Sequence, residues 1–164
     1  FFVFQDLILS TLTIKSLFTA MMHITRKHEI STAHRIYEHS GKCERLHGHN
    51  YTILLTLSAQ KLDHLGMILD FGEVKRLLFG ALDEAWDHRT LLYDIDPLVE
   101  QLTVLKEDES LVAIPFNPTA ENMAAYLGTT FFPKILEKYD IDKDVFVSSV
   151  TVFETEKSYA TWEK

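Results

Sequence analysis

Three histidines have the spacing of residues that bind one metal ion. His47 and His49 flank Gly48 at the start of a stretch that alternates polar and apolar residues as far as Ala59, the pattern of a β-strand. Residues two apart on a strand point to the same face, so both imidazoles project together. His34 ends a preceding strand-like stretch, and hairpin pairing brings it alongside them. Three neutral nitrogens favour zinc, with a fourth position open to substrate.

Cys43, the only cysteine in the chain, lies four residues before His47. Its segment is too polar for a core, and Lys42 and Arg45 beside it favour a reactive thiolate. Both cations are also candidates for binding phosphate, because of their charge and position. If Cys43 instead bound the metal as a fourth ligand, the site would be closed and structural. A non-catalytic zinc-binding module therefore stays open as an alternative function.

Other acidic residues and histidines in the sequence could transfer protons. Asp87-His88 can form a relay in which the carboxylate orients the imidazole. Asp63-His64 has the same composition, but it precedes Gly66 in a turn and is better explained as solvated surface. Glu154 lies in an apolar strand-like stretch, where a buried acid needs a partner such as a ligand.

Composition limits the class of protein. The chain has 164 residues, 46% of them hydrophobic, with 16 basic and 24 acidic residues and a net charge of -8. That length predicts one domain, and the acidic balance argues against nucleic-acid binding. A lone cysteine excludes an internal disulfide framework and favours a reducing, cytoplasmic location.

The first 21 residues have a different character from the rest. They are mostly apolar, but Asp6 and Lys15 interrupt the run, and neither a signal-peptide pattern nor an uncharged stretch long enough for a membrane span is present. Met21 and Met22 precede the first strand-like stretch. We expect residues 1–21 to be an extension and residues 22–164 to form a single domain.

The elements that must position these residues follow an α+β order. Strands are expected at 23–35, 47–59 and 145–155, with a short one at 111–114. Asp70 can cap a helix ending near 86–89, and Asn117-Pro118-Thr119 opens a second helix that Pro133 should end or kink. An antiparallel sheet covered on one face by two helices is therefore predicted. Its other face needs cover.

Six motifs in this order resemble the family of 6-pyruvoyl- and 6-carboxy-tetrahydropterin synthases. They are Ser31-Thr32-Ala33-His34-Arg35, Cys43-Glu44-Arg45-Leu46-His47-Gly48-His49-Asn50-Tyr51, Gly66-Met67-Ile68-Leu69-Asp70-Phe71, Asp87-His88, Pro118-Thr119-Ala120-Glu121-Asn122 and Glu154-Thr155. The resemblance covers residues 22–164. It departs from the usual pattern at Trp86, where leucine is common, and in a long segment from 91 to 116.

The resemblance implies a fold, an assembly and a set of roles. The fold is the tunnelling fold, a β-β-α-α-β-β subunit that joins others into a barrel, with two trimers stacked as a homohexamer. The resemblance assigns zinc binding to His34, His47 and His49. It assigns proton abstraction to Cys43 and the proton relay to Asp87 and His88. The resemblance assigns binding of the pterin ring to Glu154, and Thr119 and Glu121 match further positions of the family's substrate pocket.

The segment before the histidine pair favours one reaction within that family. Three residues separate Cys43 from His47, as in the bacterial 6-carboxytetrahydropterin synthases of queuosine biosynthesis, whereas animal 6-pyruvoyl synthases have a longer insert. We expect a zinc-dependent carbon-carbon lyase that converts 7,8-dihydroneopterin triphosphate to 6-carboxy-5,6,7,8-tetrahydropterin, acetaldehyde and triphosphate. The 6-pyruvoyl product is the alternative. Glu44 matches relatives that make 6-hydroxymethyl-7,8-dihydropterin for folate, so a second activity with Glu44 as base is a further hypothesis.

Overall fold

A long β-hairpin forms the centre of the molecule. The computed structural model describes residues 20–164, and in it β1 (Met22–His34) pairs antiparallel with β2 (His47–Ala59) along the full length of both strands. On β2 the residues from Tyr51 to Leu57 alternate between buried and half-buried, as a half-covered strand requires. The two strands expected around the histidines are confirmed.

The sheet has six strands in the order β4-β3-β1-β2-β5-β6. β5 (Phe146–Thr155) lies antiparallel to β2, and β6 (Ser158–Glu163) lies antiparallel to β5. On the other side, β3 (Thr90–Tyr93) and β4 (Leu111–Ile114) run parallel to β1. The sheet is therefore mixed, and the expectation of a purely antiparallel sheet is wrong at this edge.

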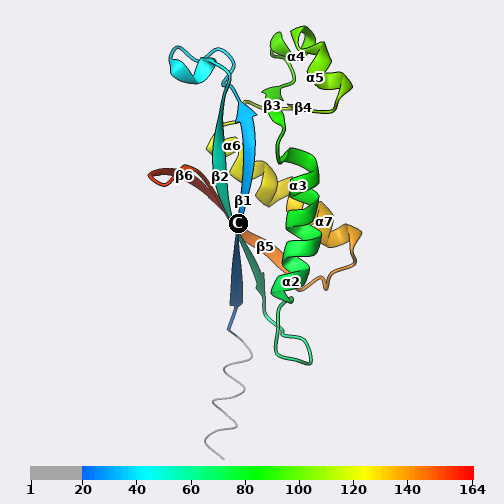
Figure 1. The fold of residues 1–164 in the computed structure, drawn as a ribbon. Coiled ribbons are helices and arrows are strands. Elements are labelled where there is room, and N and C mark those ends of the chain that lie inside the picture. The colour runs from blue at the N-terminus through cyan, green and yellow to red at the C-terminus, as the bar shows by residue number, and fades with distance from the viewer. Residues whose placement is uncertain (1–19) are drawn as a thin grey trace, which may run out of the picture.

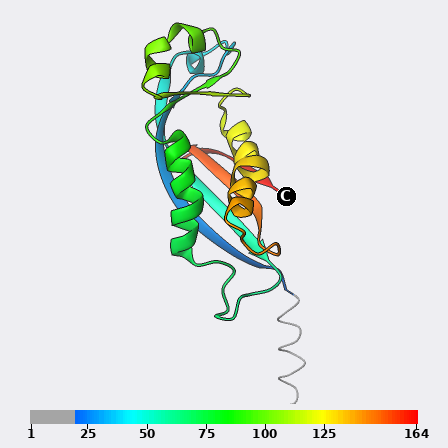
Figure 2. The same cartoon turned by 90° about the vertical axis from the view of Figure 1, so that its right-hand side faces the viewer.

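Two helical runs cover one face of the sheet (Figures 1 and 2). Asp70 caps the first by accepting from the N–H groups of Gly72 and Glu73. This run consists of α2 (Phe71–Glu73), the π-helical η2 (Val74–Phe79) and α3 (Gly80–Trp86). Thr119 caps the second, which consists of α6 (Ala120–Tyr126), the π-helical η3 (Leu127–Phe131) and α7 (Phe132–Lys138).

The second helical run does not end at Pro133. It continues to Lys138, with the proline in the first turn of α7 directly after the π-helical segment. The first turn of a helix tolerates proline because its missing N–H has no partner there in any case. Of the two outcomes expected at Pro133, an end or a kink, the end is wrong, and the regular helix is interrupted by the π-helical segment just before the proline.

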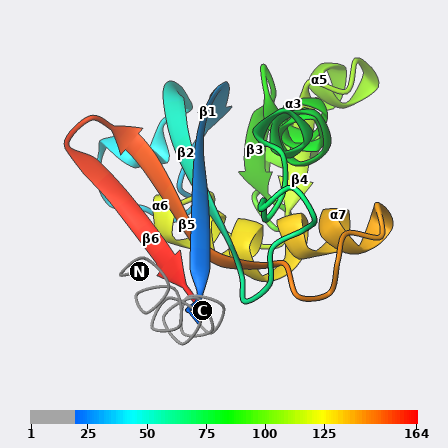
Figure 3. The ribbon, with the colours of Figure 1, turned by 90° about the horizontal axis from the view of Figure 1, so that it is seen from below.

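The core lies between these helices and the sheet. Figure 3 shows α3 nearly end-on and the α6–α7 run crossing the sheet. Phe79, Leu82, Met123 and Phe132 come from the helices and are fully buried with residues of β2 and β5. The residues of β2 that point away from this core are half-buried, so the opposite face of the sheet is the more polar one.

A small lobe joins the parallel edge. It carries α4 (Leu98–Gln101) and α5 (Thr103–Glu107), which the sequence pattern did not predict, and has its own cluster around Leu92, Val99 and Leu111. Arg35, next to His34, pairs with the fully buried Asp96 of this lobe through two hydrogen bonds. The lobe is thereby attached to the end of β1 that carries His34.

Two helical glycines differ in what a methyl group would meet. A Cβ at Gly128 would come within 2.0 Å of the Trp162 ring, whereas one at Gly80 would meet nothing closer than 3.8 Å. We expect Gly128→Ala to lower the free energy of unfolding by about 1–3 kcal/mol, because Trp162 must move. Gly80→Ala, the matched control, should raise it by about 0.5–1 kcal/mol. Denaturant unfolding checks both, and equal effects would contradict this packing.

No helix between residues 20 and 164 is both long and apolar enough to cross a membrane. Residues 1–19, most of the extension expected from the sequence, lie outside the described residues. Their proposed separation from the domain at 22–164 stays a prediction.

Candidate metal centre and adjoining pocket

Four side chains from three strands converge at one end of the sheet. In the β1–β2 register His34 lies opposite His47, and Thr32 lies opposite His49, so the three imidazoles share the helix-covered face. Glu154 of β5 completes the group, in which one ligand atom from each residue lies within 4.8 Å of the others. The structure therefore brings the three predicted histidines together and adds a carboxylate.

Backbone carbonyls orient two of the rings. Nδ1 of His34 lies 2.8 Å from the carbonyl oxygen of Pro118, and Nδ1 of His47 lies 2.7 Å from that of Arg45. A carbonyl oxygen only accepts, so each Nδ1 carries the proton and each Nε2 keeps its lone pair. Metal-binding histidines have this arrangement, because the second nitrogen is held by an outer partner.

An unpaired nitrogen of His49 further indicates that this cluster fits a metal ion. Nε2 of His49 is buried and has no hydrogen-bond partner among the described residues, although buried polar atoms are nearly always paired. The nearest charged atom, Oε1 of Glu154, lies 3.7 Å from it and 3.6 Å from Nε2 of His34. These three atoms are therefore placed to bind a cation of the kind that imidazole prefers.

Burial keeps the first histidine neutral. Desolvation lowers the pKa of His34 to about 4, aided by the neighbouring imidazoles and opposed by the Pro118 carbonyl. The Tyr51 hydroxyl lies 3.0 Å from Nε2 of His34, and burial raises the pKa of this tyrosine, so it stays protonated. At neutral pH His34 thus offers an unprotonated nitrogen, the form that binds metals.

A pocket adjoins the cluster and contains most of the other predicted residues. Its volume is about 250 Å³, and Cys43, Thr119, Glu121 and Glu154 line it. Glu154 therefore borders both the cluster and the pocket. Cys43, in the short 3-10 helix η1 (Lys42–Glu44), is half-buried and is not a member of the four-residue metal-binding group.

His39 lines the same pocket and was missed by sequence reasoning. Its Nδ1 accepts a hydrogen bond from the N–H of Gly41 at 2.8 Å, so the neutral ring carries its proton on Nε2. The only sequence signal was its position four residues before Cys43, which has no specific meaning without the fold of the loop.

Asp87 and His88 form the expected pair but face elsewhere. The carboxylate of Asp87 accepts from Nδ1 of His88 at 2.7 Å and from the N–H of Ser31 at 2.7 Å. Burial opposes ionisation of Asp87, but these hydrogen bonds prevail and its pKa is lowered. His88 lines a hollow with Ser31 and Asn50, which neighbour Thr32 and His49 in sequence and so point to the opposite face.

His88 also has an unusual backbone. Its φ is 57°, in the left-handed region that non-glycine residues seldom occupy. It directly follows Asp87, the residue that ends α3, and its N–H donates to the Ser31 carbonyl at 2.7 Å. This conformation turns the imidazole outward, where the side chain is 81% exposed.

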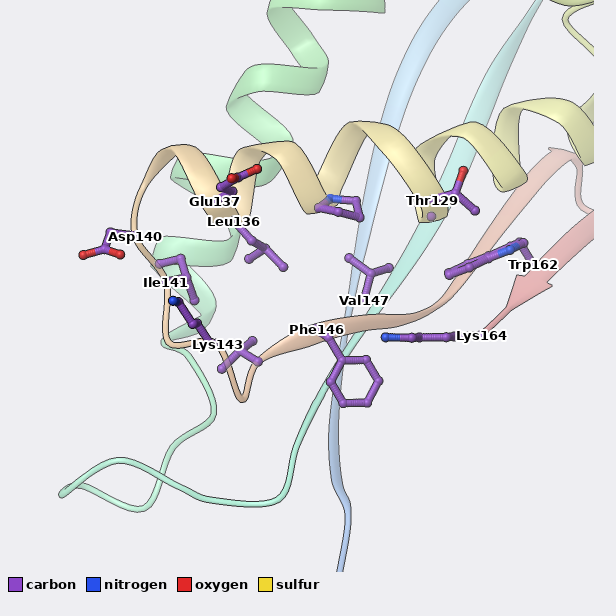
Figure 4. A pocket seen from close by; sticks show the side chains of 13 residues that line it. Thr129, Leu136, Glu137, Asp140, Ile141, Lys143, Phe146, Val147, Trp162 and Lys164 are labelled. Atoms are coloured by element: carbon purple, nitrogen blue, oxygen red, sulfur yellow. The ribbon is translucent and has the colours of Figure 1, made fainter.

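The remaining predicted residues lie outside the pocket. Glu44, Lys42 and Arg45 are exposed and do not line it. A separate, largely apolar cavity of about 550 Å³ lies at the other end of β5, where Phe146 and Trp162 form its walls (Figure 4). It has no part in the metal-binding group.

Comparison with known proteins finds relatives that are named as tetrahydropterin synthases. A family model described as 6-pyruvoyl tetrahydropterin synthase matches residues 23–164. A protein from Rickettsia bellii named 6-carboxy-5,6,7,8-tetrahydropterin synthase is 38% identical over 135 residues, which cover 82% of this chain and 95% of the relative. One of the same name from Rickettsia typhi is 35% identical over 139 residues, covering 85% and 98%.

Solved structures share the fold. An uncharacterized protein from Wolinella succinogenes aligns with a TM-score of 0.73 at 24% identity, over 88% of this chain and 99% of that one. A 6-pyruvoyltetrahydropterin synthase from Plasmodium vivax aligns with a TM-score of 0.65 at 19% identity, over 88% and 98%. The tunnelling-fold subunit expected from the sequence is confirmed by this likeness.

Proposed function

Because this chain belongs to the 6-pyruvoyl tetrahydropterin synthase family, we propose that it is a 6-carboxy-5,6,7,8-tetrahydropterin synthase. The reaction is conversion of 7,8-dihydroneopterin triphosphate to the carboxy-pterin, acetaldehyde and triphosphate, a carbon-carbon lyase reaction of queuosine biosynthesis. The relatives with this name, 35–38% identical over most of the chain, support it. The observation that carries the proposal is the histidine cluster beside a pocket that contains a thiol.

Zinc is the ion we propose for His34, His47 and His49. Bound there, it would supply Lewis-acid polarisation of substrate oxygens. The carboxylate of Glu154 accepts hydrogen bonds from two adjacent N–H groups of the pterin edge, which holds the ring beside the histidines. Thr119 and Glu121 line the same pocket and contact the ring.

Proton transfer falls to groups that line the pocket. We assign the Cys43 thiolate as the base that removes a carbon-bound proton, since Cys43 shares the pocket with Glu154 and a thiolate can act as a base. The fixed Nε2–H of His39 is a donor for oxygens of the substrate side chain. The small volume of the pocket limits the number of water molecules that can enter beside the substrate.

A second copy of the chain completes the site in this proposal. His88, which Asp87 orients, lines a different hollow from Cys43 within one chain, so their relay serves the pocket of a neighbouring copy. In the described part of the chain, β1 pairs with β3 only through Ala33 and His34, and β6 pairs only with β5. Both strands therefore have free edges for joining subunits into a barrel, and a cytoplasmic homohexamer of two stacked trimers is the assembly we propose.

The non-catalytic alternative is less well supported. It requires Cys43 as a fourth zinc ligand, but the fourth member of the group among the described residues is Glu154. Because Glu154 also borders the pocket, its carboxylate can leave the metal and bind the substrate instead. This behaviour suits an open site. The 6-pyruvoyl product remains a candidate within the same family.

Product analysis tests the proposal and the role of Glu44. Incubated with dihydroneopterin triphosphate, the wild type should yield 6-carboxytetrahydropterin and a minor amount of 6-hydroxymethyldihydropterin. Glu44→Ala should lose the minor product and keep the major one, because Cys43 remains as base. Mass spectrometry separates the two products.

Glu38→Ala, which removes another exposed carboxylate of the same loop, is the matched control and should leave both products. An unchanged product ratio in Glu44→Ala would contradict the second activity. Formation of 6-pyruvoyltetrahydropterin by the wild type would replace the main proposal by its alternative.

A further inference from the structure

The loop that carries Cys43 is closed at its base by backbone hydrogen bonds. The N–H of Ile36 donates to the carbonyl of Cys43 at 2.8 Å, and the N–H groups of Glu44 and Arg45 donate to Gly41 and Lys42. These bonds shape the loop internally. Of these, only the bond from Ile36 attaches the loop to the end of β1, so the position of the thiol also depends on contacts with other elements.

Asn117 supplies such a contact through its side-chain amide. Its Oδ1 accepts from the N–H of Tyr37 at 2.8 Å, and its Nδ2 donates to the carbonyl of the same residue at 3.1 Å. Two antiparallel hydrogen bonds to one residue fix both distance and orientation, as in a strand pair. The amide therefore holds the loop where it leaves β1.

The next residue holds the metal-binding histidine. The Pro118 carbonyl accepts from Nδ1 of His34. The segment is itself fixed, because the carbonyl of Asn117 accepts from the N–H of Thr119 at 2.7 Å and from Nδ2 of Asn122 at 3.0 Å. Two adjacent residues at the start of α6 thus fix both halves of the site, the thiol loop and a metal ligand.

We propose that Asn117 is a positioning residue that sets the place of the Cys43 thiol relative to the histidine cluster. The assignment rests on the proposed function, in which Cys43 is the base. A displacement of about 1 Å in a reacting group can reduce the rate about 100-fold. Loss of the amide frees the loop base but leaves the Pro118 carbonyl on His34, so the thiol moves and the metal ligand does not.

The test compares Asn117→Ala with Gln60→Ala, which removes an exposed side-chain amide directly after β2 and leaves both bonds to Tyr37. For Asn117→Ala we expect kcat to fall about 10- to 100-fold, with the zinc content and KM close to those of the control. Cys43, as the only cysteine, is alkylated selectively by iodoacetamide. We expect faster alkylation in Asn117→Ala than in Gln60→Ala, because its loop is released.

Asn117→Asp is the second variant, since a carboxylate of the same size accepts from the Tyr37 N–H but cannot donate to its carbonyl. Its kcat should lie between those of the wild type and Asn117→Ala. Equal kcat and alkylation rates in Asn117→Ala and the control would overturn the proposal, and so would failure of both Asn117 variants to fold or to bind zinc. If the wild type makes no carboxy-pterin, the proposed function fails, whereas the alkylation comparison still tests the role of Asn117.

Discussion

Replacement of Cys43 by alanine is expected to lower kcat for carboxy-pterin formation by about 100- to 10,000-fold, the range for loss of a general base. Cys43 is half-buried and shares its pocket with Glu154, but it lies outside the metal-binding group. Zinc content should therefore stay at the wild-type level, and so should the affinity for substrate. Steady-state kinetics and metal analysis by mass spectrometry measure both quantities.

Two further variants sharpen this result. Lys75→Ala changes an exposed residue of η2 that does not line the pocket and should retain the activity. His88→Ala should be impaired like Cys43→Ala. Co-expression of the two impaired chains should restore activity, because a mixed assembly can place an intact His88 beside an intact Cys43. Full activity of Cys43→Ala would contradict the role of the thiol, and failure of the mixture would contradict a relay supplied by a second copy.

The hairpin and the metal-binding histidines could be predicted from the sequence because both depend on local alternation. The pattern from His47 to Ala59 has period two, and the pairing of His34 with His47 follows once two such strands are adjacent. Of the two parallel strands, β4 was predicted as a short strand at 111–114 and is confirmed, whereas β3 and the parallel pairing were not predicted. Each has four residues, too few for a periodic signal, and their pairing depends on contacts distant in sequence.

The helices show a second limit of sequence patterns. The cap at Asp70 and the start at Asn117-Pro118-Thr119 placed both helical runs. The π-helical segments at Val74–Phe79 and Leu127–Phe131 were not predicted, because they keep buried residues at helical spacing. The hydrogen-bond register is not encoded in that spacing. Pro133 was expected to break the second run for the same reason, since its place in a new first turn depends on the π-helical segment before it.

The candidate site divides in a similar way. Residue types singled out Cys43 and Glu154, and the family resemblance added Thr119 and Glu121. The structure places all four in one pocket. The sequence could not show on which face of the sheet Asp87 and His88 lie, because that depends on the left-handed backbone at His88. Nor could it show the amide of Asn117 on the loop, a contact between residues 80 positions apart.

Replacement of His49 by alanine is expected to abolish both metal binding and activity. Its Nε2 is buried without a partner, so the protein without metal bears the cost of an unsatisfied polar atom, about 1–3 kcal/mol. Metal binding relieves that cost in the wild type. At a zinc concentration about 100 times the dissociation constant, binding should add about 2.7 kcal/mol to the stability of the wild type.

The unfolding temperature of the variant should differ from that of the wild type only when zinc is present. Without metal, His49→Ala loses the unpaired nitrogen and is expected to unfold at a temperature close to that of the wild type. With zinc added, the wild type should gain several degrees and the variant almost none, since loss of one of three histidines weakens binding by more than the about 10- to 100-fold typical of outer partners. His64→Ala, which removes an exposed imidazole in a turn, should gain as much as the wild type. Equal stabilisation of His49→Ala and His64→Ala by zinc would show that the ion binds elsewhere, and the cluster of His34, His47, His49 and Glu154 would then need another explanation for its unpaired nitrogen.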